Sequence, residues 1–184
     1  MDPQLVRLSK FLSLVLRHDP QKVGLKLEEG GWVEVAALLS AMQKRGMPVD
    51  LALLERVVAE NDKQRFSFSP DRLKIRANQG HSVQVDLGLA PRTPPERLYH
   101  GTAARNADSI RAQGLLKGRR HAVHLSPDAE TARRVGERHG EPGHDESLVL
   151  VIQSGRMAAD GFIFYCSDNG VWLTEHVPPE YIDQ

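Results

Sequence analysis

The stretch GLAPRTPPERLYH, residues 88–100, decides how the chain is organised, because it separates two different sequence patterns. It holds three prolines within five residues, and proline fixes φ and removes a backbone donor, so the stretch is typical of a stiff linker. Helical periodicity dominates before it, whereas short strands alternate with helices after it. We therefore predict an α+β protein with one lobe over residues 1–90 and a second over 91–184.

Before the linker, apolar residues recur at helical spacing over residues 4–17, 34–46 and 51–61, and Asp50 is a suitable N-cap for the third helix. The segment RFSFSPDRLKIRA, residues 65–77, alternates with period two on both sides of a Pro-Asp turn, which predicts a β-hairpin. Helices followed by a basic hairpin are the layout of a winged-helix module. Many small α+β domains share that layout.

After the linker, the pattern predicts a second α+β lobe with its own strands and helices. The expected strands are RLYHGT (97–102), AVHLS (122–126), the buried SLVLVIQ (147–153) and a closing hairpin of FIFYCS (162–167) with GVWLT (170–174); the expected helices are 104–114 and 128–140, and EPGHDES (141–147) is a polar loop.

Bulk composition excludes several classes of protein. Among 184 residues there is one cysteine, Cys166, so no internal disulfide is possible and a reducing compartment is favoured. No secretory signal is recognisable, and no apolar run approaches the ~20 residues of a membrane span. We expect a cytoplasmic monomer without a membrane partner.

The net charge of zero conceals two basic islands. Residues 92–121 carry seven Lys or Arg against two acidic residues, and residues 63–78 carry five against one. Such islands suit a polyanion, although a solvated surface has the same composition. Paired carboxylates and a Ser-His-Asp arrangement are not recognisable, and neither are the glycine motifs of Rossmann and P-loop nucleotide sites.

Candidate functional residues are mostly cationic or small and polar. Arg17 and His18 end the first helix before a proline; they either complement the helix dipole or form an anion site. The loop ANQGHS, residues 77–82, is either a turn or a phosphate-binding loop. In an extended AVHLS segment His124 and Ser126 share one face, and no cysteine or carboxylate nearby completes a zinc site, so we expect no metal.

Taken together, these segments resemble the KptA-type RNA 2′-phosphotransferase family from about residue 5 to 182. The motifs that carry the resemblance are SKFLSLVLRHDP, GGWVEVAALL, RFSFS followed by LKIRANQGHSV, LYHGT, HLS and SDNGVWLTEHVPPEYI. The resemblance implies a winged-helix-like, RNA-binding lobe over residues 1–90 and an ADP-ribosyltransferase-like, NAD-binding lobe over residues 91–184.

The resemblance also implies a reaction that uses NAD as co-substrate and needs no metal. An internal RNA 2′-phosphate attacks the anomeric carbon of the nicotinamide ribose and nicotinamide leaves. The ribose 2″-hydroxyl then attacks phosphorus, which frees the RNA 2′-hydroxyl and yields ADP-ribose 1″,2″-cyclic phosphate. In organisms that splice tRNA through a 2′-phosphate junction, that junction is the expected substrate.

Residue roles follow by matching the motifs, and three guanidiniums with one imidazole are expected to surround the 2′-phosphate. The chain departs from the family pattern at Ala122, which replaces the first histidine of an H-V-H-L-S strand. The implied catalytic residues are Arg17, His18, Arg65 and Arg120; the implied NAD-binding residues are His100, Gly101, Thr102, His124, Ser126 and Asn169; and the implied RNA-binding residues are His81, Ser82 and Arg119.

Two other functions remain open from the sequence. The same fold can ADP-ribosylate a terminal nucleic-acid phosphate or a protein acceptor and stop after the first step. A non-enzymatic winged-helix nucleic-acid-binding protein is the other alternative, but such a protein has no use for LYHGT, the implied NAD motif.

Overall fold

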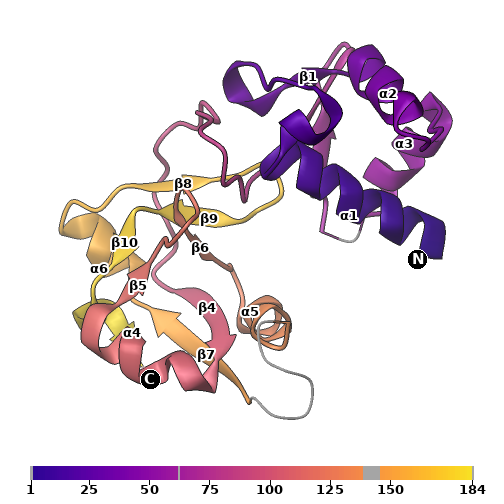
Figure 1. The fold of residues 1–184 in the computed structure, drawn as a ribbon. Coiled ribbons are helices and arrows are strands. Elements are labelled where there is room, and N and C mark those ends of the chain that lie inside the picture. The colour runs from indigo at the N-terminus through magenta and orange to yellow at the C-terminus, as the bar shows by residue number, and fades with distance from the viewer. Residues whose placement is uncertain (1, 62, 139–145, 184) are drawn as a thin grey trace. The chain divides into compact units, whose positions relative to one another are not determined.

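The computed structural model describes residues 2–61, 63–138 and 146–183, drawn in colour in Figure 1. These residues form a mixed α/β protein whose chain separates into two compact units, Met1–Gly88 and Leu89–Gln184, called unit 1 and unit 2 below. The division lies at the start of the proline-rich stretch, close to the boundary expected after residue 90. Each unit has its own hydrophobic core.

The described residues of unit 1 include three α-helices: α1 (Pro3–Arg17), α2 (Val35–Lys44) and α3 (Leu51–Ala59). They confirm the three helices expected from apolar periodicity. Asp50 caps α3 as predicted, because its side chain accepts a hydrogen bond of 2.8 Å from the backbone N–H of Leu53.

A small antiparallel sheet completes unit 1, in the order β1-β3-β2. β2 (Phe66–Phe68) and β3 (Lys74–Ala77) form the predicted hairpin. β1 (Val33–Glu34) pairs with the other edge of β3, which is the central strand. The core contains Leu12 and Leu16 of α1, Leu38 and Met42 of α2, Leu54 of α3, and Phe66 and Ile75 of the hairpin. The short 3₁₀ helices η1 (Pro20–Val23) and η2 (Glu29–Gly31) lie between α1 and β1. The winged-helix assignment itself stays a prediction.

The described residues of unit 2 form three small antiparallel sheets. The strand β7 runs between β4 and β11, β9 runs between β6 and β8, and β5 pairs with β10. Their bounds are β4 (Leu98–Ala103), β5 (Leu115–Leu116), β6 (Val123–Leu125), β7 (Ser147–Ile152), β8 (Phe164–Cys166), β9 (Trp172–Thr174), β10 (His176–Val177) and β11 (Ile182–Asp183).

The helices of unit 2 are short, and α5 matters most for the predicted site because it packs on β4 and β7 (Figure 1). Asp128 caps α5 by accepting a 2.7 Å hydrogen bond from the N–H of Thr131. The helices are α4 (Ala107–Gln113), α5 (Ala129–Gly136), α6 (Ser154–Ala159), and the 3₁₀ helices η3 (Ala104–Asn106) and η4 (Pro179–Tyr181).

The expected strands and helices of the second lobe are confirmed except in detail. The prediction that β7 is a buried strand is wrong in part. Only Leu150 and Ile152 of β7 are buried, and its other residues, including Val151 between them, are half-buried. Helix α6 and the strands β5, β10 and β11 were not predicted, since each is too short to show a period. Most of the expected loop 141–147 lies outside the described residues.

Candidate active site

The first candidate cluster is in unit 1, where α1 ends at Arg17. His18 donates its backbone N–H to the carbonyl of Leu14 and closes the helix, and Pro20 starts the next element. Arg17 is half-buried and His18 is exposed. Arg17 is the last helical residue and His18 the C-cap, so the two side chains leave adjacent positions of the helix end.

A loop over residues 78–83 packs on this helix end. The backbone N–H groups of Ser82 and Val83 both donate to the carbonyl of Arg17, at 2.8 and 3.3 Å. Gly80 has φ +85°, and a Cβ placed there would lie 3.5 Å from Arg17 Nη1, so the bare backbone runs beside the guanidinium. The helix C-terminus and the polar loop predicted from the sequence are therefore one structural feature.

His18 and Ser82 are linked through their side chains. His18 Nδ1 lies 2.9 Å from Ser82 Oγ, so the hydroxyl and the imidazole share a hydrogen bond. This contact leaves Nε2 as the nitrogen on the other side of the ring. Ser82, which the family resemblance places near RNA phosphates, is thus also in a position to orient His18.

His81 has a different environment from its neighbour. Its side chain is 2% exposed, and Gly31 of η2 approaches so closely that a Cβ there would lie 3.2 Å from His81 Nε2. This burial ties the loop to the turn before β1. The role of His81 toward RNA stays a prediction.

Arg65 is brought to the start of the same loop. Its backbone carbonyl accepts a 2.9 Å hydrogen bond from the N–H of Asn78, and its Nη1 donates to Asn61 Oδ1 at 3.2 Å. The loop 78–83 thus begins beside Arg65 and ends beside Arg17. Unit 1 therefore places Arg17, His18 and Arg65 beside one loop, which itself contains Ser82. Arg17 and Ser82 lie far apart in sequence.

The second candidate cluster is in unit 2, where β4 meets the end of β6. Tyr99 and Ser126 exchange two backbone hydrogen bonds, at 2.9 and 2.7 Å, which joins the two strands. His100 Nδ1 then lies 2.9 Å from the carbonyl oxygen of His124. His124 Nδ1 lies 3.0 Å from the carbonyl oxygen of Ala122.

These contacts determine the tautomers of both histidines. A carbonyl oxygen can only accept, so the Nδ1 atoms of His100 and His124 carry the hydrogen. In the neutral rings Nε2 is then the acceptor atom. His100, His124 and the buried Ser126 thus lie together in unit 2, and their role toward NAD stays a prediction.

Gly101 and Thr102 are held mainly by packing. A Cβ on Gly101 would lie 1.6 Å from the carbonyl oxygen of Ala132 in α5, so the close approach of helix and strand requires glycine. Thr102 is 6% exposed, and its hydroxyl accepts a 2.9 Å hydrogen bond from Asn106. Their contacts with NAD stay a prediction.

The remaining predicted residues lie in turns of unit 2. Arg119 and Arg120 are exposed, and Arg120 donates its backbone N–H to Lys117 at 3.1 Å. Asn169 lies in the turn between β8 and β9, where its Oδ1 accepts a 2.6 Å hydrogen bond from Ser167 Oγ. Which of the two arginines binds phosphate stays a prediction.

Three polar residues that support this site were not named individually from the sequence, although Asn78 belongs to the candidate loop 77–82. Ser9, Asn61 and Asn78 are 5%, 2% and 3% exposed, and all three take part in hydrogen bonds of unit 1. Ser9 stands among leucines on the apolar face of α1, and a polar residue in such a stripe is a signal that could have identified it.

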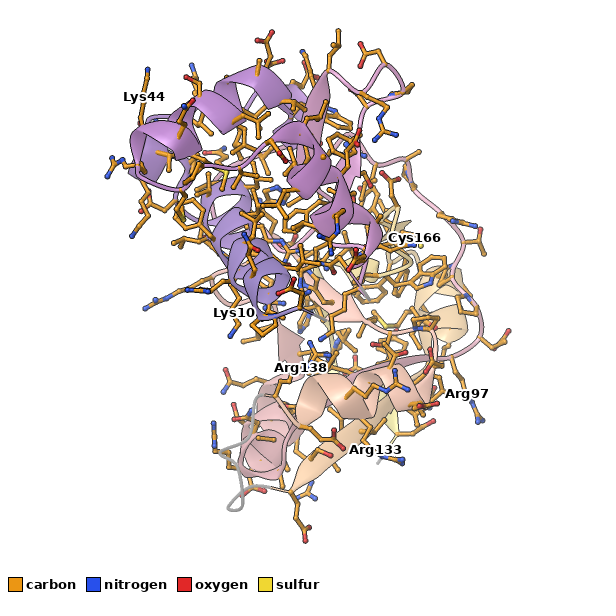
Figure 2. All side chains as sticks on the ribbon, turned by 90° about the vertical axis from the view of Figure 1, so that its right-hand side faces the viewer. Lys10, Lys44, Arg97, Arg133, Arg138 and Cys166 are labelled. Atoms are coloured by element: carbon orange, nitrogen blue, oxygen red, sulfur yellow. The ribbon has the colours of Figure 1, made fainter. Side chains whose placement is uncertain are left out.

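Both units carry cationic side chains on their surface. The five cationic residues labelled in Figure 2 are all exposed: Lys10 on α1, Lys44 on α2, and Arg97, Arg133 and Arg138 in unit 2. Among the residues that the structure describes, no three His, Cys, Asp or Glu side chains gather in an arrangement that could hold a metal ion. The helices of the described chain are all too short or too polar to cross a membrane.

Comparison with known proteins agrees with the motifs. The family model described as "RNA 2′-phosphotransferase, Tpt1 / KptA family" matches residues 3–176. The chain is 55% identical over 177 residues to a probable RNA 2′-phosphotransferase of Trichormus variabilis, covering 96% of this chain and 94% of the relative.

Two further relatives carry the same name, probable RNA 2′-phosphotransferase. That of Nostoc punctiforme is 52% identical over 183 residues, covering 100% of this chain and 98% of its own. That of Flavobacterium johnsoniae is 52% identical over 176 residues, covering 96% and 94%. The resemblance seen in the sequence is thereby confirmed, and the chain belongs to the RNA 2′-phosphotransferase family.

Proposed function

We propose that this protein is an NAD-dependent RNA 2′-phosphotransferase that removes an internal 2′-phosphate from RNA. The observation that supports this most directly is the single loop, residues 78–83, that runs between Arg65 and the Arg17-His18 pair. Guanidinium groups bind a phosphate through two parallel N–H donors, and a glycine loop lets backbone approach the same anion. Family membership supplies the reaction that such a phosphate site serves.

The proposed NAD co-substrate fits the donor set of unit 2. His100 and His124 present imidazoles whose tautomers are fixed, and Ser126 supplies a hydroxyl at the strand junction. Imidazole and hydroxyl groups are suitable partners for ribose hydroxyls and phosphate oxygens. When bound, NAD supplies a ribose carbon that accepts the 2′-phosphate as nicotinamide leaves. The products are RNA with a free 2′-hydroxyl, nicotinamide and ADP-ribose 1″,2″-cyclic phosphate.

Arg17 and Arg65 are proposed to hold the 2′-phosphate before and during transfer. Correct placement of a nucleophile lowers the barrier by several kcal/mol, because its orientation is already restricted. During attack on phosphorus, negative charge grows on the phosphoryl oxygens. Guanidiniums that are already in place stabilise that charge without reorganising. Arg120 is kept as a third proposed phosphate ligand on the family resemblance.

His18 is proposed to act on the phosphate, with its ring held by Ser82 at Nδ1. The imidazole either binds a phosphate oxygen or delivers a proton to the departing RNA 2′-oxygen. In the second step one proton must be removed by a base and one must be supplied by an acid. The ribose 2″-hydroxyl loses a proton, and the RNA oxygen gains one.

One experiment tests the proposal. The purified protein is incubated with NAD and an oligoribonucleotide that carries one internal 2′-phosphate, and the products are resolved by mass. We expect dephosphorylated RNA, nicotinamide and ADP-ribose cyclic phosphate in equal amounts. An RNA that retains an ADP-ribose adduct would indicate ADP-ribosylation without the second step. RNA binding without any NAD consumption would overturn the enzyme and favour the nucleic-acid-binding alternative.

A further inference from the structure

A buried polar cluster lies behind Arg65 in unit 1. Asn61 follows helix α3 and is 2% exposed, and Ser9, in the middle of helix α1, is 5% exposed. Asn61 Nδ2 donates to Ser9 Oγ at 2.8 Å. Because both groups are buried, this hydrogen bond fixes the asparagine side chain relative to helix α1.

The other end of the same amide faces Arg65. Asn61 Oδ1 accepts from the backbone N–H of Lys63 at 3.1 Å and from Arg65 Nη1 at 3.2 Å. A backbone N–H and a guanidinium can only donate, so the oxygen of the amide must face them. The orientation of Asn61 is therefore decided by chemistry and leaves Nδ2 for Ser9.

The backbone of this segment is held separately. Gln64 has φ +40°, an uncommon conformation for a residue other than glycine. Its carbonyl accepts a 2.6 Å hydrogen bond from Asn78 Nδ2, and the next carbonyl, that of Arg65, accepts from Asn78 N at 2.9 Å. Asn78 thus fixes the main chain of Arg65, whereas Asn61 contacts the guanidinium.

We propose that Asn61 is a positioning residue that acts through Arg65, holding its guanidinium in the orientation that receives the RNA 2′-phosphate. A neutral amide suits this task, since it accepts from the guanidinium without cancelling its charge. A carboxylate at the same place would pair with Arg65 and compete with the phosphate. This inference rests on the proposed function, because it assumes that Arg65 binds the 2′-phosphate.

The test compares two oligoribonucleotides that differ only in one internal 2′-phosphate. The dissociation constant of the oligonucleotide without the 2′-phosphate, divided by that of the oligonucleotide with it, measures recognition of the phosphate. In this ratio the contacts with the rest of the RNA cancel. A purely structural effect of a substitution weakens both oligonucleotides alike and leaves the ratio unchanged. The ratio is measured for the wild-type protein, Asn61→Ala, Arg65→Ala and the double variant.

We expect Asn61→Ala to lower the ratio several-fold, and Arg65→Ala to lower it further. In the Arg65→Ala background, Asn61→Ala should change the ratio by less than about 1.5-fold. The effects of two substitutions do not add when one residue acts through the other. Equal effects of Asn61→Ala with and without Arg65 would overturn the inference. So would an unchanged ratio in the single variant.

Two further variants separate stability from positioning. Ser69→Ala removes hydrogen bonds to Asp71 and Lys74 in the β2–β3 turn without touching Arg65, and it should lower the melting temperature but keep the ratio. Asn61→Asp keeps the size and shape of the side chain, so this variant replaces Asn61→Ala in the test if Asn61→Ala does not fold. It should lower the ratio through its charge, and a wild-type ratio in a folded Asn61→Asp protein would overturn the inference.

Failure of the underlying function gives a different result. If the wild-type protein binds both oligonucleotides equally and Arg65→Ala changes nothing, the proposed 2′-phosphate site itself is wrong. If Arg65→Ala removes the discrimination and Asn61→Ala does not, only the role of Asn61 is wrong.

Discussion

His18 Nδ1 lies 2.9 Å from Ser82 Oγ, a hydrogen bond between residues that are 64 positions apart in the chain. The same serine donates its backbone N–H to the carbonyl of Arg17. One residue therefore holds both members of the Arg17-His18 pair, the arginine through its main chain and the histidine through its ring. Orientation of an imidazole by a partner at its second nitrogen determines which nitrogen faces the substrate.

Substitution of Ser82 tests this relationship. Ser82→Ala keeps the backbone bond to Arg17 but loses the contact with His18, and a hydrogen bond of about 1 kcal/mol corresponds to about a fivefold lower rate. Ser82→Thr retains a hydroxyl and should recover most of that loss. The measurement is the rate of cyclic-phosphate formation at saturating NAD and RNA. A threonine variant as slow as the alanine variant would argue against the role of the hydroxyl.

Arg17 is expected to contribute through geometry as well as charge. Arg17→Ala should slow cyclic-phosphate formation by roughly 10²–10³-fold, the usual loss for one donor to a developing anion. Binding of NAD should change far less. Arg17→Lys keeps the charge but loses the planar fork, so it should remain strongly impaired. Full activity of the lysine variant would show that charge alone suffices.

The fixed tautomer of His100 predicts which substitution it tolerates. The side-chain amide of asparagine can replace Nδ1 and still donate to the carbonyl of His124, whereas it has no atom at the position of Nε2. We therefore expect His100→Asn to melt within a few degrees of the wild type but to raise the KM for NAD about tenfold. Titration with NAD measures the change. A variant with wild-type KM would remove His100 from the proposed NAD site.

Gly101 tests the packing between β4 and α5. A Cβ at this position would lie 1.6 Å from the carbonyl oxygen of Ala132, so Gly101→Ala must push the helix and strand apart. We expect a loss of several kcal/mol in the free energy of unfolding, as for other severe overpacking. Gly118→Ala is the matched control in the same unit. Its Cβ meets nothing within 4 Å, and φ +60° there costs about 1–2 kcal/mol. Urea denaturation compares the two, and similar losses would contradict the packing argument.

Asp128 predicts a pH dependence of stability. The N–H and the hydroxyl of Thr131 hydrogen-bond its carboxylate and hold its pKa below the ordinary value of 3.8. A lowered pKa in the folded state adds stability above pH 3.8, and this contribution disappears as the pH falls through the folded pKa. Asp128→Asn keeps a cap but does not titrate.

The melting temperatures of the wild type and Asp128→Asn should therefore differ most near neutral pH, with the wild type higher. The difference should shrink as the pH is lowered below about 4, since the advantage of the carboxylate is lost on protonation. Other titrating groups cancel in this comparison. A difference that stays constant from pH 6 to pH 3 would contradict the proposed cause.

The sequence by itself determined the local elements and the chemical types of the site. The apolar periodicity of α1, the cap at Asp50 and the alternation around the β2–β3 turn all express interactions between residues near in sequence, and the structure confirms them. Short elements such as α6 and β5 were not predicted, because two to six residues carry too little periodicity. Recognition of the family rested on motifs, and it placed candidate residues without their contacts.

Only the tertiary structure decided how those residues are held. The bond of Asn61, which also contacts Arg65, to Ser9 depends on packing the segment after α3 against the middle of α1. The bond of Ser82 to His18 depends on packing the loop 78–83 against the end of α1. The sequence could not reveal them, because a buried amide and a solvated one look alike until their partners are known. The close approach that requires Gly101 is likewise a property of two packed elements and not of either alone.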